Sequence, residues 1–186
     1  LPFLILLSLT PAFGDSADPF FPFVEARLND PVAWAPWTAP ESVKTDRPVL
    51  LFISHAMSET TAVMARESFR NPDTAALINE HFDAIVMDAH RHPIPALTYA
   101  TYLQALKKVG NWPGTLFLTP SLEPIDGGGY YPPTDDWGRA SFGNVLESIA
   151  NQWNENRHGV LDAARNQVEQ INWITGTEAL PAEIDA

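Results

Sequence analysis

Residues 47–69 read RPVLLFISHAMSETTAVMARESF, and this stretch decides the fold. Its unbroken apolar run, Val49 to Ile53, suits a strand that is buried on both faces, as in a parallel sheet. From Ser58 onward the spacing of apolar residues is helical, and the Ser58 side chain suits an N-cap. Because backbone N–H groups at a helix start point towards a ligand, we expect any functional site of this chain to begin at this junction.

The chain after this helix predicts a βαβ unit. Asn71 and Pro72 are typical of the N-cap and first position of a further helix. The segment from Phe82 to Asp88 predicts a second strand, parallel to the first. Since the C-terminal ends of parallel strands share one sheet edge, we expect His55 to lie beside the loop at residues 89–93.

The rest of the chain predicts further elements of an α/β fold. They are a helix over Leu97 to Val109, strands over Thr115 to Leu118 and around Glu123 to Asp126, and a long helix from Ser141, bent near Gly159. Three glycines and two prolines predict a loop over Asp126 to Pro133. A phosphate cradle is excluded there, because the Lys and following Ser or Thr of a phosphate loop are missing.

The first residues have the features of an export signal. The apolar run Leu1 to Leu9 is too short for a membrane span, which needs about 20 residues. With small residues at Ala12 and Gly14, it predicts a signal peptide remnant and a periplasmic or secreted protein. We expect the chain to divide into four segments: a signal peptide remnant at 1–14, an extended arm at 15–27, a single α/β domain at 28–174, and a linker or truncated end at 175–186.

Charge and cysteine content exclude several classes of function. The chain has 11 Lys plus Arg against 23 Asp plus Glu, a formal net charge of −12. This balance argues against nucleic acid and anionic membrane surfaces as partners. With no cysteine in its 186 residues, the chain cannot carry out thiol–disulfide exchange or form thiolate metal sites.

Several motifs then point to a family. The element order is that of the thioredoxin fold, and five segments carry a closer likeness: Asn29 to Trp37, Val63 to Phe69, Gly110 to Pro113, Leu118 to Pro120, and Gly127 to Pro133. Over about residues 28–165 the chain resembles the N-terminal thioredoxin-like domain of the spermatogenesis-associated protein 20 family. The resemblance implies a three-layer α/β/α sandwich with a mixed four-stranded sheet and a long C-terminal helix. It also implies a cis peptide bond at Pro113, facing the first main helix, and longer relatives that continue into an (α/α)6 barrel.

The chain departs from the family at its redox motif. Aligned on Arg66 to Phe69, the family's Cys-x-x-Cys falls on Ser58-Glu59-Thr60-Thr61, so hydroxyls replace both thiols. The expected function is therefore a non-redox module that binds a protein or peptide, without a cofactor. The binding positions are expected at Ser58, Glu59, Thr60, Thr61, Trp112 and Pro113. The alternative is an accessory domain of a larger sugar-processing-type enzyme with an (α/α)6 barrel.

Two more specific sites remain open. Ser58 and His55 form a hydrolytic pair in one hypothesis, with Asp88 at the end of the neighbouring strand. In the other, His55, His90 and His92 bind zinc or copper, and the protein is a metal carrier or metalloenzyme. The simpler interpretations are a helix cap for Ser58 and exposed loop positions for the histidines, and we expect no catalytic residue.

Other polar and aromatic side chains have two interpretations each. Glu67 is expected at the surface or paired with Arg66 or Arg70. Trp112, Tyr130 and Tyr131 either line a groove beside Pro113 or pack the adjoining hairpin.

Overall fold

The computed structural model describes residues 22–43, 45–107, 109–110, 112–135 and 138–175. The predicted signal peptide at 1–14 lies outside these residues, as do 15–21 of the predicted arm and 176–186 of the predicted linker. No helix within the described residues has the length and apolar character of a membrane span.

The sheet has five strands in the order β1-β3-β2-β4-β5. Their bounds are β1 Ala35–Pro36, β2 Val49–Ser54, β3 Asp83–Asp88, β4 Gly114–Leu118 and β5 Pro124–Gly128. β2 pairs in parallel with β3 and antiparallel with β4, so it lies at the centre, as its apolar run predicts. Every residue of β2 is buried.

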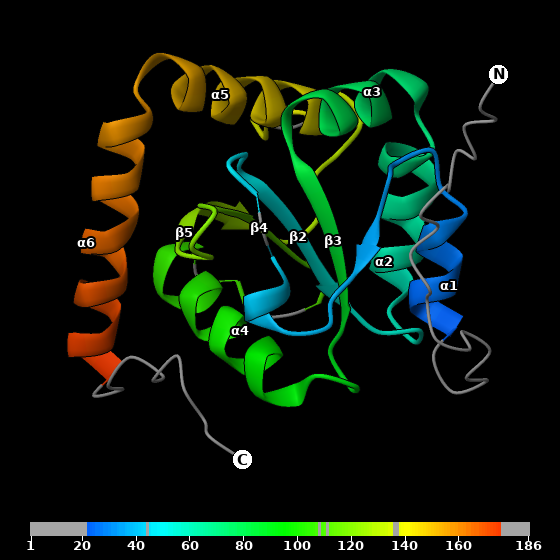
Figure 1. The fold of residues 1–186 in the computed structure, drawn as a ribbon. Coiled ribbons are helices and arrows are strands. Elements are labelled where there is room, and N and C mark those ends of the chain that lie inside the picture. The colour runs from blue at the N-terminus through cyan, green and yellow to red at the C-terminus, as the bar shows by residue number, and fades with distance from the viewer. Residues whose placement is uncertain (1–21, 44, 108, 111, 136–137, 176–186) are drawn as a thin grey trace, which may run out of the picture.

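Helices cover both faces of the sheet (Figure 1). They are α1 Pro22–Leu28, η1 Pro40–Ser42, α2 Glu59–Met64, η2 Ala65–Phe69, α3 Pro72–His81, α4 Pro93–Lys107, α5 Phe142–Glu155 and α6 Arg157–Thr175. Side chains of α1, α2, η2, α3 and α5 pack with Leu50 and Phe52 on one face, while those of α4 pack with Leu51 and Ile53 on the other. The expected three-layer α/β/α sandwich is confirmed.

Helix caps follow the sequence closely. Ser58 Oγ accepts a hydrogen bond from Thr61 N at 3.3 Å, and Asn71 Oδ1 accepts from Asp73 N and Thr74 N at 2.9 and 3.1 Å. These side chains satisfy N–H groups that have no partner inside their helices. They start α2 and α3 where predicted.

The predicted extended arm is wrong where the structure describes it. Residues Pro22–Leu28 form α1, with Pro22 at its start and Phe23 and Arg27 buried. Proline suits a helix start, and residues four apart lie on the same face. Seven residues give only two such positions, which is too few for a visible period.

The sheet is larger than the four strands expected. Ala35 and Pro36 pair in parallel with Ile85 and Val86, which adds the short edge strand β1. At the opposite edge, Gly127 belongs to β5 rather than to the predicted loop. A Cβ at Gly127 would lie 2.7 Å from Leu103 Cδ2 and 2.9 Å from Thr115 O, so glycine is needed for α4 to pack closely on β5.

Two helix boundaries differ from the prediction. α4 begins at Pro93, four residues before the expected Leu97, since prolines are tolerated in a first turn. The C-terminal helix is two helices, divided at Asn156 (φ −144°, ψ 54°) rather than bent near Gly159. Asn156 Oδ1 accepts a hydrogen bond from Gly159 N at 3.1 Å and so caps α6. The chain changes direction at this point, and α6 then runs alongside β5 (Figure 1).

Candidate functional site

The strand register brings the predicted site segments to one edge of the sheet. Ser54 pairs with Asp88 at the C-terminal ends of β2 and β3. On the other side of β2, Ile53 pairs with Gly114, so Pro113 follows in line at the same edge. The Trp112–Pro113 peptide bond is cis, as the resemblance implies.

The two hydroxyls that replace thiols serve the fold. Ser58 caps α2, and Thr61 is buried with its Oγ1 hydrogen-bonded to the Oγ of Ser54, itself fully buried. Glu59 and Thr60, between them, are exposed. The α2 start therefore keeps a reachable surface while its inner hydroxyl is satisfied within the protein.

Trp112 and Pro113 contribute mainly packing. Pro113 is buried, and Trp112 is half-buried against the apolar cluster on the α4 face. A Cβ at Gly114 would lie 2.8 Å from Leu103 Cδ1 and 3.3 Å from Trp112 Cζ3, so the missing side chain makes room for both. The minor part of Trp112 that stays exposed is available for a partner.

A serine hydrolase relay is not assembled. Asp88 is buried, and its Oδ1 accepts from the backbone N–H groups of His90 and Arg91 at 2.8 and 3.2 Å. The Nδ1 atom of His55 is buried without a hydrogen-bond partner. The carboxylate-to-imidazole contact that would orient a base towards Ser58 is therefore missing.

The histidines meet only in part. The rings of His55 and His90 stack with centroids 4.8 Å apart and an interplanar angle of 20°, which confirms that their two loops are neighbours. Imidazole nitrogens bind metals in the plane of the ring, so stacked rings do not converge on one ion. Among the described residues, which include His92, no three His, Asp or Glu side chains are arranged to hold a metal.

His92 gives the site a dependence on pH. Burial and the Arg91 charge lower the pKa of His92, against an opposite influence from Asp88. Because the pKa in the folded chain lies below the unfolded value of about 6.5, the folded state disfavours the protonated ring. The stability from neutral His92 is complete above that value and is lost as the pH falls through the folded pKa.

His92→Gln is therefore expected to remove part of the acid destabilisation that sets in as the pH falls below about 6.5. Melting temperatures of the two proteins across this range measure the effect. The expected curves diverge below about pH 6.5, with the variant falling less. Parallel curves would contradict it.

A contact that the sequence does not predict links η2 to the segment after β5. Glu67 Oε2 accepts a hydrogen bond from the Tyr130 hydroxyl at 2.8 Å. Glu67 Oε1 lies 3.8 Å from Arg66 Nη2, which is one of the two pairings that the sequence predicts for this carboxylate. Ser68 Oγ, buried, donates to Tyr131 O at 3.2 Å. The motifs Val63 to Phe69 and Gly127 to Pro133 therefore fold onto one another.

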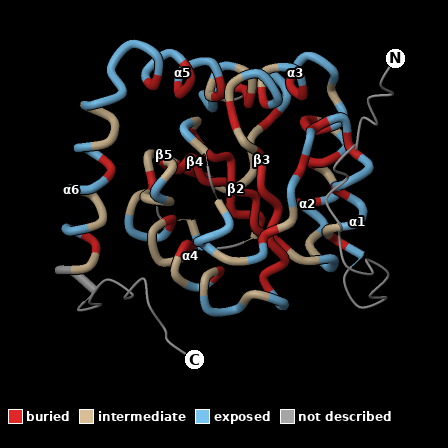
Figure 2. Tube along the Cα trace, in the orientation of Figure 1, coloured by how far each residue is buried: buried red, intermediate tan, exposed pale blue. Residues whose placement is uncertain are grey.

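Three large apolar side chains at the site edge are exposed, and sequence reasoning missed them. Met57, Ile94 and Leu97 are 86%, 69% and 68% exposed. Met57 lies two residues after His55, while Ile94 and Leu97 lie on one side of α4 just after His90. We call these three residues the edge apolar patch. Figure 2 shows the exposure around the start of α4, next to the buried strand ends.

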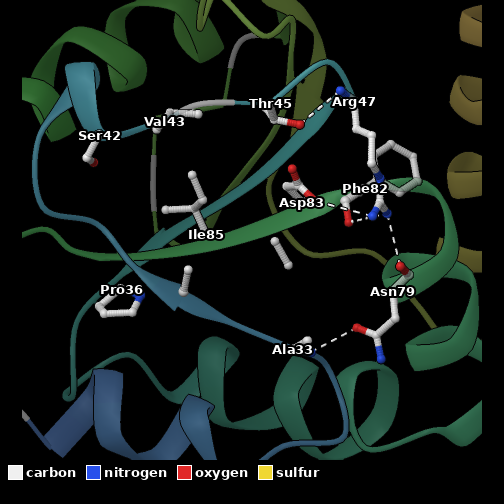
Figure 3. A pocket seen from close by; sticks show the side chains of 12 residues that line it. Ala33, Pro36, Ser42, Val43, Thr45, Arg47, Asn79, Phe82, Asp83 and Ile85 are labelled. Atoms are coloured by element: carbon white, nitrogen blue, oxygen red, sulfur yellow. Dashed lines mark hydrogen bonds and ion pairs between the residues drawn. The ribbon is translucent and has the colours of Figure 1, made fainter. Parts of the chain in front are cut away.

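A separate cavity of about 320 Å³ lies at the other end of β3 (Figure 3). Arg47 Nη2 donates to Asn79 O at 2.9 Å and Phe82 O at 2.7 Å, and its Nη1 lies 3.3 Å from Asp83 Oδ1. Asn79 Oδ1 in turn accepts from Ala33 N at 2.8 Å. These polar groups hold the cavity wall together, and none of the predicted site residues lines it.

Known proteins resemble this chain in sequence and in fold. Spermatogenesis-associated protein 20 from Rattus norvegicus is 33% identical over 144 residues, which cover 76% of this chain and 18% of that protein. The human protein of the same name is 32% identical over 144 residues, which again cover 76% of this chain and 18% of that protein. Uncharacterized protein B0495.5 of Caenorhabditis elegans is 34% identical over 135 residues, 71% of this chain and 18% of that protein. The chain thus matches about a fifth of the length of these relatives.

Two solved structures align with the fold. A structure described as DsbH oxidoreductase has a TM-score of 0.45 and 14% identity, and covers 67% of this chain and 86% of its own. A disulphide isomerase from Xylella fastidiosa Temecula1 has a TM-score of 0.39 and 17% identity, and covers 86% of this chain and 98% of its own.

A family model named for thioredoxin and DsbH matches residues 17–172. This match and the relatives confirm the resemblance drawn from the motifs. The absence of cysteine agrees with a replaced Cys-x-x-Cys. The chain therefore belongs to the thioredoxin-like family described as "Protein of unknown function, DUF255", to which its spermatogenesis-associated protein 20 motifs point.

Proposed function

We propose that this domain binds an extended segment of another protein, without redox chemistry, at the sheet edge that carries the α2 start. The observation that supports this proposal most directly is the exposure of the edge apolar patch near the start of α2, where hydroxyls stand in place of the family's thiols. The binding surface comprises the reachable positions Ser58, Glu59 and Thr60, the exposed part of Trp112, and this patch. Thr61 and Pro113 are buried beneath this surface and contribute packing rather than contacts with the partner.

The surface has the chemistry of a protein interface. Scattered single apolar residues are ordinary on a protein surface, but these three lie in the segments that follow β2 and β3 at one sheet edge, which favours an interaction site there. The α2 start adds backbone N–H groups that suit the carbonyl oxygens of an extended chain. With a net charge of −12, the protein favours a partner segment that is apolar with neutral or basic flanks.

Leu97→Asp is expected to weaken binding by at least about tenfold, because it places an unpaired charge in an apolar contact. Peptides selected from a random library against the wild-type chain serve as the probe, with affinity read by fluorescence anisotropy. Leu97 is 68% exposed, so the folded state is expected to tolerate the change, as a thermal melt will show.

Leu28→Asp is the matched control. Leu28 is also a large exposed apolar residue, at 46%, but it ends α1 rather than lying at the site edge. The two variants carry the same change in charge. Equal affinity of both variants for the selected peptides would refute the proposed site.

A second candidate is an accessory domain within a longer chain. The observation that favours it is the length of the curated relatives, of which the matched segment makes up 18%. Reading the gene beyond residue 186 tests this candidate. Several hundred further residues with paired amphipathic helices would support it, and a stop codon within a few residues would refute it.

A further inference from the structure

We propose that Met57 is a site of reversible oxidation by hydroperoxides, and that its sulfoxide weakens binding at the sheet edge. The effect on binding rests on the proposed function, whereas the oxidation itself does not. Met57 is 86% exposed, while Met64 and Met87, the other two methionines, are fully buried. Peroxide therefore reaches one thioether of the three in the folded chain.

The position of this sulfur is informative. Met57 directly precedes Ser58, the position at which the resemblance implies the first thiol of the family. With no cysteine in the sequence, Met57 carries the reachable sulfur of this edge. The chemistry proposed for this edge is therefore oxygen transfer at the residue before the helix cap, rather than thiol exchange at the cap.

The reaction balances with a hydroperoxide as the oxidant. The thioether sulfur attacks one peroxide oxygen, a sulfur–oxygen bond forms, and the oxygen–oxygen bond breaks. The sulfur loses two electrons, and hydrogen peroxide is reduced to water. Methionine sulfoxide reductases reverse the change.

The product alters the edge apolar patch. A sulfoxide is polar and accepts hydrogen bonds, so covering it with an apolar segment leaves a desolvated oxygen without a partner. We expect the affinity for the selected peptides to fall about tenfold when Met57 is oxidised. Ile94 and Leu97, at 69% and 68% exposure, have no such chemistry and stay apolar.

The first experiment treats the full chain with hydrogen peroxide and follows each methionine by peptide mass spectrometry. Met57 is expected to gain oxygen at least about tenfold faster than Met64 and Met87. In urea, where all three are exposed, the rates are expected to converge. Equal rates in the folded chain, or slower reaction at Met57, would overturn the assignment.

The second experiment measures peptide affinity before and after oxidation. The wild-type affinity is expected to fall and to recover after treatment with a methionine sulfoxide reductase. Met57→Leu keeps an apolar side chain without sulfur, so its affinity, whatever the starting value, is expected not to respond to peroxide.

Full oxidation of Met57 with unchanged affinity would overturn the regulatory part of the proposal. If no peptide binds the untreated chain, the proposed function fails, and the oxidation rates alone decide the modification site.

Discussion

Asp30→Ala is expected to lower the free energy of unfolding by about 3 to 5 kcal/mol, since it leaves a buried Arg27 without its counter-charge. The Asp30 side chain is fully buried, and that of Arg27 is 7% exposed. Arg27 Nε lies 3.0 Å from Asp30 Oδ2, but its alignment is too poor for a hydrogen bond, so the attraction is ionic. Arg70 Nε donates to Asp30 Oδ1 at 3.3 Å, from a side chain that is 61% exposed.

Burial dominates the electrostatics of this pair. It raises the pKa of Asp30 and lowers the pKa of Arg27, each against the attraction of the other charge. Such a pair adds little net stability compared with apolar side chains, but breaking it is costly. The double variant Arg27→Met, Asp30→Ala is therefore expected to recover most of the stability lost in Asp30→Ala.

Urea unfolding measures the effect, and Asp83→Ala is the matched control. Asp83 also pairs with an arginine, Arg47, but both side chains are about 40% exposed (42% and 38%). An exposed pair contributes less than about 1 kcal/mol. A similar loss for Asp30→Ala and Asp83→Ala would show that burial is not the cause.

The double variant Ser58→Cys, Thr61→Cys is expected to form an internal disulfide and to accelerate the reduction of insulin by dithiothreitol. The wild-type chain has no cysteine and so cannot accelerate this reaction by thiol exchange. Ser58 caps α2 and Thr61 is three residues on, with Ser58 Oγ and Thr61 N 3.3 Å apart. One helical turn brings the two Cβ atoms within reach of a disulfide. The helix start also lowers the pKa of the outer thiol.

Ser141→Cys combined with Asn144→Cys is the matched control for redox activity. Ser141 caps α5 in the same way, with its Oγ 3.3 Å from Asn144 N. This second pair is also expected to form a disulfide, but it lies away from the edge that binds a partner segment. Equal insulin reduction by both pairs would mean that the helix start alone, and not this edge, confers activity.

The central elements could be predicted because local chemistry specifies them. Five consecutive apolar residues give β2, and side-chain caps at Ser58 and Asn71 set the starts of α2 and α3. Elements held by distant contacts were missed or misplaced. Gly127 lies in β5 through its pairing with Leu116, and Leu103 of α4 packs close against it. The division at Asn156 has another reason, because the apolar period continues through the break and does not mark it.

The sequence predicts which segments of the chain meet at the site, but not how their side chains are arranged. A parallel pair of strands requires His55 and His90 to be neighbours, and the thioredoxin order places Pro113 beside them. Whether the two imidazoles converge or stack depends on side-chain geometry that spacing does not encode. The exposure of the edge apolar patch is equally hidden, because an apolar residue at a helix start is buried or exposed according to what packs over it.

The most direct test of the proposed function is a nuclear magnetic resonance titration of the ¹⁵N-labelled chain with a selected peptide. The account predicts changes in amide chemical shift at Met57 to Thr61, at Trp112, and at Ile94 and Leu97. Amides around Arg47, beside the separate cavity, should stay in place. Shifts centred on that cavity, or no shifts at the sheet edge with a bound peptide, would contradict it.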